Sequence, residues 1–132
     1  MMQQREYIAV VDDDESVRES LPDLIGVFGH KAVAFASANE FLTSDIVDRV
    51  KCLVLDIAMP GMSGIELQRE IARQGRTIPI VFITAHGDEQ VCQRLRQSGS
   101  VECLLKPFTD TALHDALDAV LHRRVSPGNL QL

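Results

Sequence analysis

The chain has 132 residues, a length typical of one domain with its own hydrophobic core. It is 45% hydrophobic and 24% charged, which is ordinary for a globular protein and too apolar for a disordered one. Thirteen Lys and Arg against nineteen Asp and Glu give a net charge of −6, so we expect this segment to bind neither nucleic acid nor an anionic membrane surface.

Short apolar segments alternate with segments of helical period along the chain, which predicts βα units around a parallel sheet. The expected strands are Tyr7–Val11, Lys31–Phe35, 52–56, Ile80–Thr84 and Val101–Leu105. The first, third and fourth are apolar on both faces, as central strands covered by helices must be. The second and fifth are therefore predicted to flank them.

Amphipathic patterns predict the first and last helices. Apolar residues at helical spacing in the first are Val17, Leu21, Leu24, Ile25 and Phe28. Those in the last are Leu113, Ala116, Leu117, Val120 and Leu121. Pro22 falls inside the first helix, where it removes the hydrogen bond to the Arg18 carbonyl, so we expect a bent helix there.

Capping signals place the three helices in between. Ser37 with Glu40 and Ser63 with Glu66 have the spacing of capping boxes, which mark helix starts. Glycines stand where helix C-caps are expected, at Gly29, Gly75 and Gly99.

The cysteines and the termini carry few signals. Cys52, Cys92 and Cys103 are odd in number and lack metal-ligand spacing, so we expect no disulfide framework, no zinc site and a reducing cytoplasm. Cys52 and Cys92 are interpreted as core residues. No leader pattern follows Met1 and no apolar run approaches the ~20 residues that span a bilayer, so neither export nor membrane insertion is expected.

Polar side chains gather where the predicted strands end. In an open parallel sheet, ligands bind beyond the carboxyl ends of the strands. The residues at or just after those ends are Asp12, Asp13, Asp14, Asp56, Thr84 and Lys106. Taken singly, each has an ordinary alternative: Asp13 or Asp14 as a helix cap, Thr84 as a turn residue and Lys106 as a solvated lysine.

Taken together, these residues predict phosphoryl-transfer chemistry. Crowded carboxylates repel one another and need a hard cation or a cationic side chain, for which Mg²⁺ and Lys106 are the candidates. Mg²⁺ is usually held by one or two carboxylates, which leaves a third as nucleophile and predicts an aspartyl phosphate. Thr84 would donate a hydrogen bond to the phosphoryl group.

Four motifs carry a resemblance to a known family. They are VVDDD at residues 10–14, LDIAMPGMSG at 55–64, ITAHGD at 83–88 and LKPF at 105–108. From about residue 7 to 123 the chain resembles the receiver domain of bacterial two-component response regulators. It is most similar to receivers that precede LuxR-type helix-turn-helix output domains.

The resemblance implies a flavodoxin-like, doubly wound (βα)5 fold with five parallel strands in the order 2-1-3-4-5. It implies that Asp56 is the phosphoacceptor. Asp13 would bind Mg²⁺ directly with the assistance of Asp12, and Asp56 and the backbone carbonyl of Ala58 would complete the protein ligands. A sensor histidine kinase would be the phosphodonor, and the domain would not be a turnover enzyme.

Other implications concern switching. Thr84 and Lys106 would contact the phosphoryl group, and the Lys106-Pro107 peptide would be cis. An aromatic residue is usual three positions before this lysine, where the chain has Cys103. We therefore expect the signal to pass from Thr84 through the loop that contains His86 into the fourth helix. An activated homodimer is expected on the face of the fourth helix and the fifth strand.

Domain limits and alternatives complete the prediction. We expect a tail at 1–6, the receiver at 7–124 and a tail or linker stub at 125–132, with any output domain outside this sequence. A stand-alone receiver or metal-independent interaction module is one alternative. A phosphatase of the haloacid dehalogenase class is another, disfavoured because Ala58 stands where that class has its general acid.

Overall fold

The computed structural model describes residues 4–85, 87–97 and 101–123. The elements are, in chain order, β1 Tyr7–Val11, α1 Glu15–Val27, β2 Lys31–Phe35, α2 Ala38–Leu42, the 3-10 helix η1 Val47–Arg49, β3 Val50–Asp56, α3 Gly64–Arg73, β4 Ile80–Thr84, α4 Glu89–Gln97, β5 Val101–Leu105 and α5 Asp110–Arg123. All pairs in the sheet are parallel, in the order β2-β1-β3-β4-β5. The flavodoxin-like fold and strand order are confirmed.

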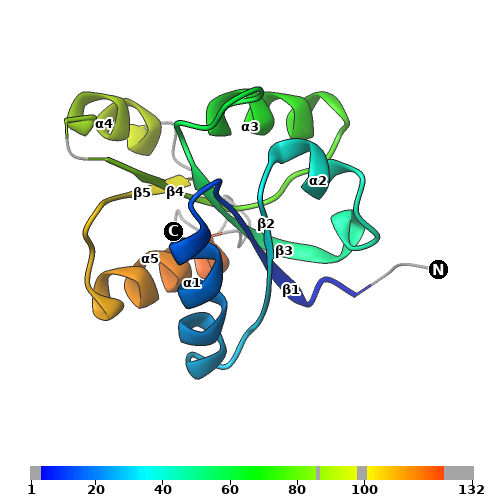
Figure 1. Ribbon diagram of the computed structural model, residues 1–132, viewed down its shortest axis with the longest axis horizontal. Helices are drawn as coiled ribbons and strands as arrows, with labels where there is room; N and C mark the ends of the chain where they lie inside the picture. The colour runs from blue at the N-terminus through cyan, green and yellow to red at the C-terminus, as the bar shows by residue number, and fades with distance from the viewer. Residues whose placement is uncertain (1–3, 86, 98–100, 124–132) are drawn as a thin grey trace, which may run out of the picture.

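The helices cover both faces of this sheet. In Figure 1, α1 and α5 lie on one side, and α2, α3 and α4 lie on the other. Side chains alternate between the two cores along each strand: Ala9 and Val11 of β1 join the core under α2 and α3, whereas Ile8 and Val10 join the core under α1 and α5. This alternation fixes the register of each strand, and the parallel pairing places the carboxyl ends at one edge.

The strand bounds agree with the prediction except in β3. This strand begins at Val50, two residues before the predicted start, because Val50 pairs with Tyr7 of β1. All five residues of β4 are buried, as expected for a central strand, whereas no residue of the edge strand β2 is fully buried. Within the described ranges, no helix combines the length and apolar character needed to cross a membrane.

The helix starts follow the predicted caps with one difference. Ser63 and Glu66 form a complete capping box at α3. At α2 the Ser37 hydroxyl accepts from the Glu40 N–H, but the Glu40 carboxylate accepts from the N–H of Ala36. Gly29 and Gly75 have φ of 95° and 82° after α1 and α3, while the predicted cap Gly99 lies outside the described residues.

Helix α1 continues through Pro22, as predicted. Leu21 and Ile25 on either side of the proline are buried in the core, and this packing holds the helix together across the missing hydrogen bond. The bend of the axis stays a prediction.

The cysteine prediction is wrong for two of the three residues. Cys92 on α4 and Cys103 on β5 form a disulfide, with their Cα atoms 5.4 Å apart. The two lie 11 positions apart in the sequence, and only the packing of α4 over β5 brings them together. Cys52 is a free, buried cysteine, and the predicted burial of Cys52 and Cys92 is confirmed.

Candidate functional site

Three carboxylates meet at the carboxyl edge of the sheet. Asp12 follows β1 directly and Asp56 is the last residue of β3, and the two strands are neighbours. One oxygen each from Asp12, Asp13 and Asp56 lies within 4.8 Å of the others. Asp12 and Asp56 are buried, whereas Asp13 is exposed. The structure therefore brings the predicted carboxylates together.

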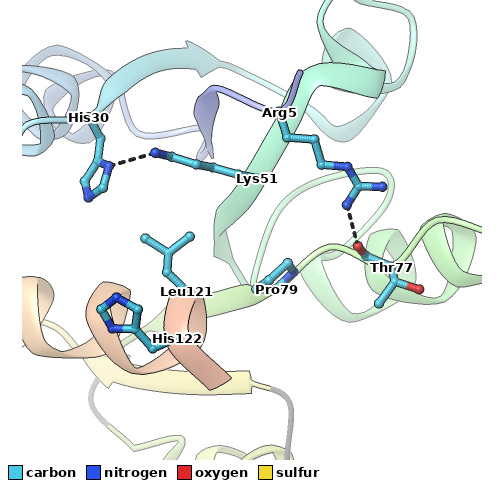
Figure 2. Close-up of a pocket in the computed structure, with 7 residues that line it drawn as sticks. All are labelled: Arg5, His30, Lys51, Thr77, Pro79, Leu121 and His122. Atoms are coloured by element: carbon cyan, nitrogen blue, oxygen red, sulfur yellow. Dashed lines mark hydrogen bonds between the residues drawn. The ribbon is translucent and has the colours of Figure 1, made fainter. Parts of the chain in front are cut away.

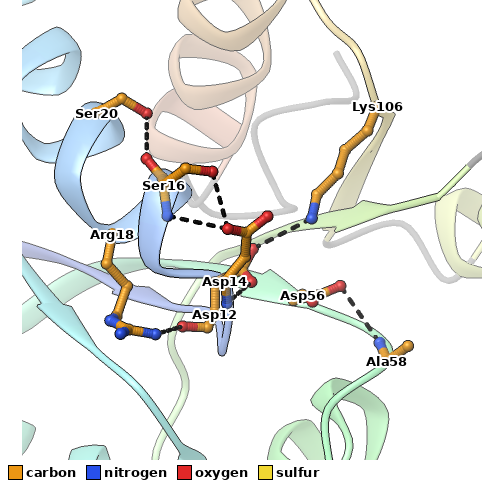
Figure 3. A network of polar contacts seen from close by, with 8 residues as sticks. All are labelled: Asp12, Asp14, Ser16, Arg18, Ser20, Asp56, Ala58 and Lys106. Carbon is orange, nitrogen blue, oxygen red and sulfur yellow. Dashed lines mark hydrogen bonds and ion pairs between the residues drawn. The ribbon is translucent and has the colours of Figure 1, made fainter.

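Asp12 is fixed by contacts from three directions, which Figure 3 shows together. Its Oδ1 accepts a 2.9 Å hydrogen bond from the N–H of Asp14, and its Oδ2 lies 3.4 Å from Nζ of Lys106. Its backbone carbonyl accepts from the Arg18 guanidinium at 3.1 Å. Asp14 itself caps α1 by accepting from the N–H of Ser16, so the helix-cap interpretation holds for Asp14.

Lys106 approaches the carboxylates from the end of β5. Its backbone N–H donates to the Thr84 carbonyl at 2.8 Å, which continues the pairing of β4 with β5. The Lys106-Pro107 peptide is cis, as predicted. The Lys106 side chain is 30% exposed, and its ammonium group pairs with the fully buried side chain of Asp12.

The backbone around Asp56 is tightly packed against the start of α3. The N–H of Ala58 points to Oδ1 of Asp56 at 3.4 Å. A Cβ placed on Gly64 would lie only 2.4 Å from the Asp56 carbonyl oxygen, so this position accepts no side chain without a shift of the backbone. Gly64 ends the LDIAMPGMSG motif, but the motif did not predict its close packing against Asp56. Its place directly after the Ser63 cap was the available signal.

The electrostatics favour a cation at this edge. Burial raises the pKa of Asp56 to about 6, and the neighbouring Asp12 carboxylate adds to the shift, while Lys106 opposes it. The three carboxylates form a set of hard oxygen donors of the kind that Mg²⁺ takes. The residues present therefore fit a divalent cation. A ligand role of the Ala58 carbonyl stays a prediction.

Thr84 is buried at the end of β4, as predicted, but its hydroxyl is already engaged. It donates to Oδ2 of Asp88 at 2.5 Å. Asp88 ends the ITAHGD motif, and its hydrogen bond with Thr84 was not predicted from the sequence. His86, the predicted switch residue between them, lies outside the described residues.

Cys103, at the position where an aromatic switch residue is usual, is fully buried within the core under α2 and α3 and is bonded to Cys92. It carries no ring that could change its exposure. Any role of Cys103 in switching must therefore depend on its bond to α4.

A separate cavity of about 620 Å³ lies at the opposite edge of the sheet, where β3 and β4 begin. Figure 2 shows its lining side chains, which are Arg5, His30, Lys51, Thr77, Pro79, Leu121 and His122. No carboxylate is among them, so this cavity offers no oxygen set for Mg²⁺. This cavity therefore adds no second candidate for the metal site.

Known proteins resemble the chain in both sequence and structure. The response regulator receiver domain family matches residues 8–118. Nodulation protein W of Bradyrhizobium diazoefficiens is 47% identical over 116 residues, which cover 88% of this chain and 51% of that protein. Response regulator protein TmoT of Ectopseudomonas mendocina is 37% identical over 121 residues, covering 92% and 55%.

Solved structures agree. The response regulator StyR superposes with a TM-score of 0.79 at 46% identity, covering 89% of this chain and 60% of that one. FixJ-N superposes with a TM-score of 0.79 at 33% identity, covering 94% and 99%. The chain spans about half the length of the curated relatives described above. It belongs to the response regulator receiver domain family.

Proposed function

We propose that Asp56 accepts a phosphoryl group from the phosphohistidine of a sensor histidine kinase in the cytoplasm. Mg²⁺ would be held by Asp12, Asp13, Asp56 and the carbonyl of Ala58. The observation that carries the proposal is the group of three carboxylate oxygens within 4.8 Å of one another, two of the carboxylates buried, with Lys106 beside Asp12. Such a cluster is unfavourable without a cation and suits phosphoryl transfer with one.

In the proposed step, a carboxylate oxygen of Asp56 forms a bond to phosphorus as the bond between phosphorus and the imidazole nitrogen breaks. The electron pair of the broken bond stays on the imidazole. When bound, Mg²⁺ neutralises charge on the phosphoryl oxygens. Lys106 adds a fixed positive charge on the same side, because its approach is set by β5. The Thr84 hydroxyl would donate a hydrogen bond to a phosphoryl oxygen after its hydrogen bond to Asp88 breaks.

The domain would act as a switch that receives one phosphoryl group, not as an enzyme that turns over a substrate. Relatives named as transcriptional regulatory proteins include TdiR of Thauera aromatica and FixJ of Azorhizobium caulinodans. We infer that the receiver, at 7–124, controls transcription through a LuxR-type helix-turn-helix output in a longer protein. The phosphorylated form would pair through α4 and β5. The net charge of −6 supports an output in which this segment itself does not contact DNA.

The test is phosphorylation with a small acyl phosphate or a phosphohistidine donor, followed by intact-mass measurement. One phosphoryl group should appear only with Mg²⁺, and Asp56→Asn should abolish it. The matched control is Asp23→Asn, an exposed aspartate on α1 away from the cluster, which should retain full labelling. Undiminished labelling of Asp56→Asn, or labelling in excess chelator, would contradict the proposal.

A further inference from the structure

Helix α4 buries few of its residues against the sheet. Of its nine residues, only Cys92 is fully buried, while Leu95 packs half-buried against the same core. Six of the nine are exposed. Segments with so few buried apolar contacts open locally at low free-energy cost. The bond from Cys92 to Cys103 is therefore a major part of what holds α4 to β5.

A second contact reaches the same residue of β5. The Arg96 guanidinium donates to the backbone carbonyl of Cys103. Cys103 sits in the middle of β5, fully buried beside Phe82 of β4, with which it pairs in the sheet. The strand is thus the rigid partner and α4 the element that can move.

The disulfide also lies one helical turn from the switch residues. The N–H of Cys92 donates to the Asp88 carbonyl at 3.0 Å, and the Asp88 carboxylate accepts from the Thr84 hydroxyl. A continuous chain of contacts therefore runs from the end of β4, through the first turn of α4, to the middle of β5. A movement of Thr84 toward Asp56 would have to displace Asp88, and the disulfide restrains the turn that carries it.

We propose that Cys92 and Cys103 form a reversible thiol oxidation site whose disulfide clamps α4 on β5 and whose reduction frees the helix to follow Thr84. The consequence for signalling rests on the proposed phosphorylation of Asp56. The attachment of α4 to β5 by the disulfide does not depend on that phosphorylation. The site would make the receiver responsive to the thiol redox state as well as to its phosphodonor, and it takes the position where an aromatic switch residue is usual.

The oxidant is a low-molecular-weight disulfide of the glutathione class. The thiolate of one cysteine attacks a sulfur of glutathione disulfide, which forms a mixed disulfide and releases one glutathione. The second cysteine thiolate then displaces the other glutathione. Two electrons pass from the cysteine pair to the oxidant, and the two thiol protons end on the two glutathione thiols. A dithiol reductant reverses both steps.

Both sulfurs are buried, so exchange requires α4 to open, and the weak attachment of this helix provides the route. Cys52 provides an internal control. It lies in the other core, under α1 and α5, and burial raises the pKa of its thiol to about 12. Little of it would be the reactive thiolate, and the central strand β3 gives it no opening of the kind that α4 gives the pair, so it should stay reduced while the pair responds.

The experiment equilibrates the 132-residue chain in glutathione buffers from reducing to oxidising, traps free thiols by alkylation and identifies the modified cysteines by peptide mass. Cys92 and Cys103 should convert together and reversibly, in the wild type and in Cys52→Ala alike. Hydrogen exchange is then compared between the two states. Amides of α4 should exchange about tenfold faster after reduction, while those of α3 should not change. Failure of the pair to convert, or equal exchange of α4 in both states, would overturn the proposal.

A second arm measures self-association by sedimentation with beryllofluoride as a phosphoryl mimic. The reduced chain, and Cys92→Ala and Cys103→Ala under any redox condition, should associate about tenfold more tightly with the mimic than the oxidised wild type does. Equal association in the oxidised and reduced chains would overturn the gating. If the mimic has no effect on the reduced chain, the proposed phosphoacceptor function fails, and the exchange of α4 still decides the clamp.

Discussion

The hydroxyl of Thr84 donates a 2.5 Å hydrogen bond to the carboxylate of Asp88, the residue before α4 begins. Hydrogen bonds from a hydroxyl to a carboxylate at this distance are among the stronger ones in proteins. Thr84 can reach a phosphoryl group on Asp56 only by giving up this contact. The pair therefore stabilises the arrangement that exists before phosphorylation.

Replacing Asp88 with Ala should favour the activated arrangement. Hydrogen bonds to charged groups contribute about 1.5–3 kcal/mol, so the loss of this acceptor should shift the switching equilibrium by about tenfold or more. Titration of the reduced chain with beryllofluoride should show half-maximal association at a correspondingly lower concentration. The control is Gln90→Ala, a substitution at an exposed position of α4. An equal midpoint in both variants would show that the Thr84–Asp88 hydrogen bond does not hold back switching.

Removing Asp13 should abolish stabilisation by Mg²⁺. A ligand at 100 times its Kd stabilises the folded state by about 2.7 kcal/mol, and Asp13 contributes an exposed carboxylate to the cluster. Asp13→Ala should fold normally yet lose the rise in Tm that Mg²⁺ gives the wild type. Asp23→Ala should keep that rise, and an equal rise in both variants would place the metal elsewhere.

Gly64→Ala should destabilise the protein and shift the backbone of Asp56, the proposed phosphoacceptor. The new methyl group would lie 2.4 Å from the Asp56 carbonyl oxygen, and overpacking of this kind costs about 1–3 kcal/mol. Gly26→Ala is the matched control, because its Cβ would meet no heavy atom within 4 Å and alanine favours helix α1 by about 0.5–1 kcal/mol. Denaturant unfolding should move in opposite directions for the two variants. A neutral Gly64→Ala would contradict the close packing.

His30 should make stability depend on pH. Burial lowers its pKa below the ordinary 6.5, Lys51 and His114 lower it further, and Asp118 opposes the shift. Nδ1 of His30 lies 3.0 Å from Nζ of Lys51, which suits a neutral imidazole that accepts from the ammonium. The unfolded chain therefore binds the proton more readily. The stability linked to His30 is present above pH 6.5 and is lost as pH falls through the lowered pKa.

The measurement compares the free energy of unfolding against pH for the wild type and His30→Gln. The wild type should lose more stability on acidification than the variant. The carboxyl group of Asp56, with its raised pKa, also titrates in this range. It is present in both proteins, so its contribution cancels in the difference between the two curves. Lys51→Gln should show an intermediate slope, and parallel curves for the wild type and His30→Gln would contradict the assignment.

The succession of strands and helices along the chain, and the grouping of the carboxylates, could be predicted from the sequence alone. Apolar runs and helical stripes report on burial, which governs local periodicity. A residue at the end of a parallel strand has little freedom in where it can lie. The positions of Asp12 and Asp56 followed from these two facts, because the ends of β1 and β3 meet at one edge of the sheet.

Contacts between elements that are distant in the chain, and the directions of side chains that are free to rotate, could not be predicted in this way. The start of β3 at Val50 depends on pairing with β1, and the Cys92–Cys103 bond depends on how α4 lies over β5. The direction of the Thr84 hydroxyl depends on its rotamer and on a competing acceptor, Asp88. Neither hydrophobic period nor residue spacing encodes these features, because each depends on a partner that only the assembled fold brings into contact.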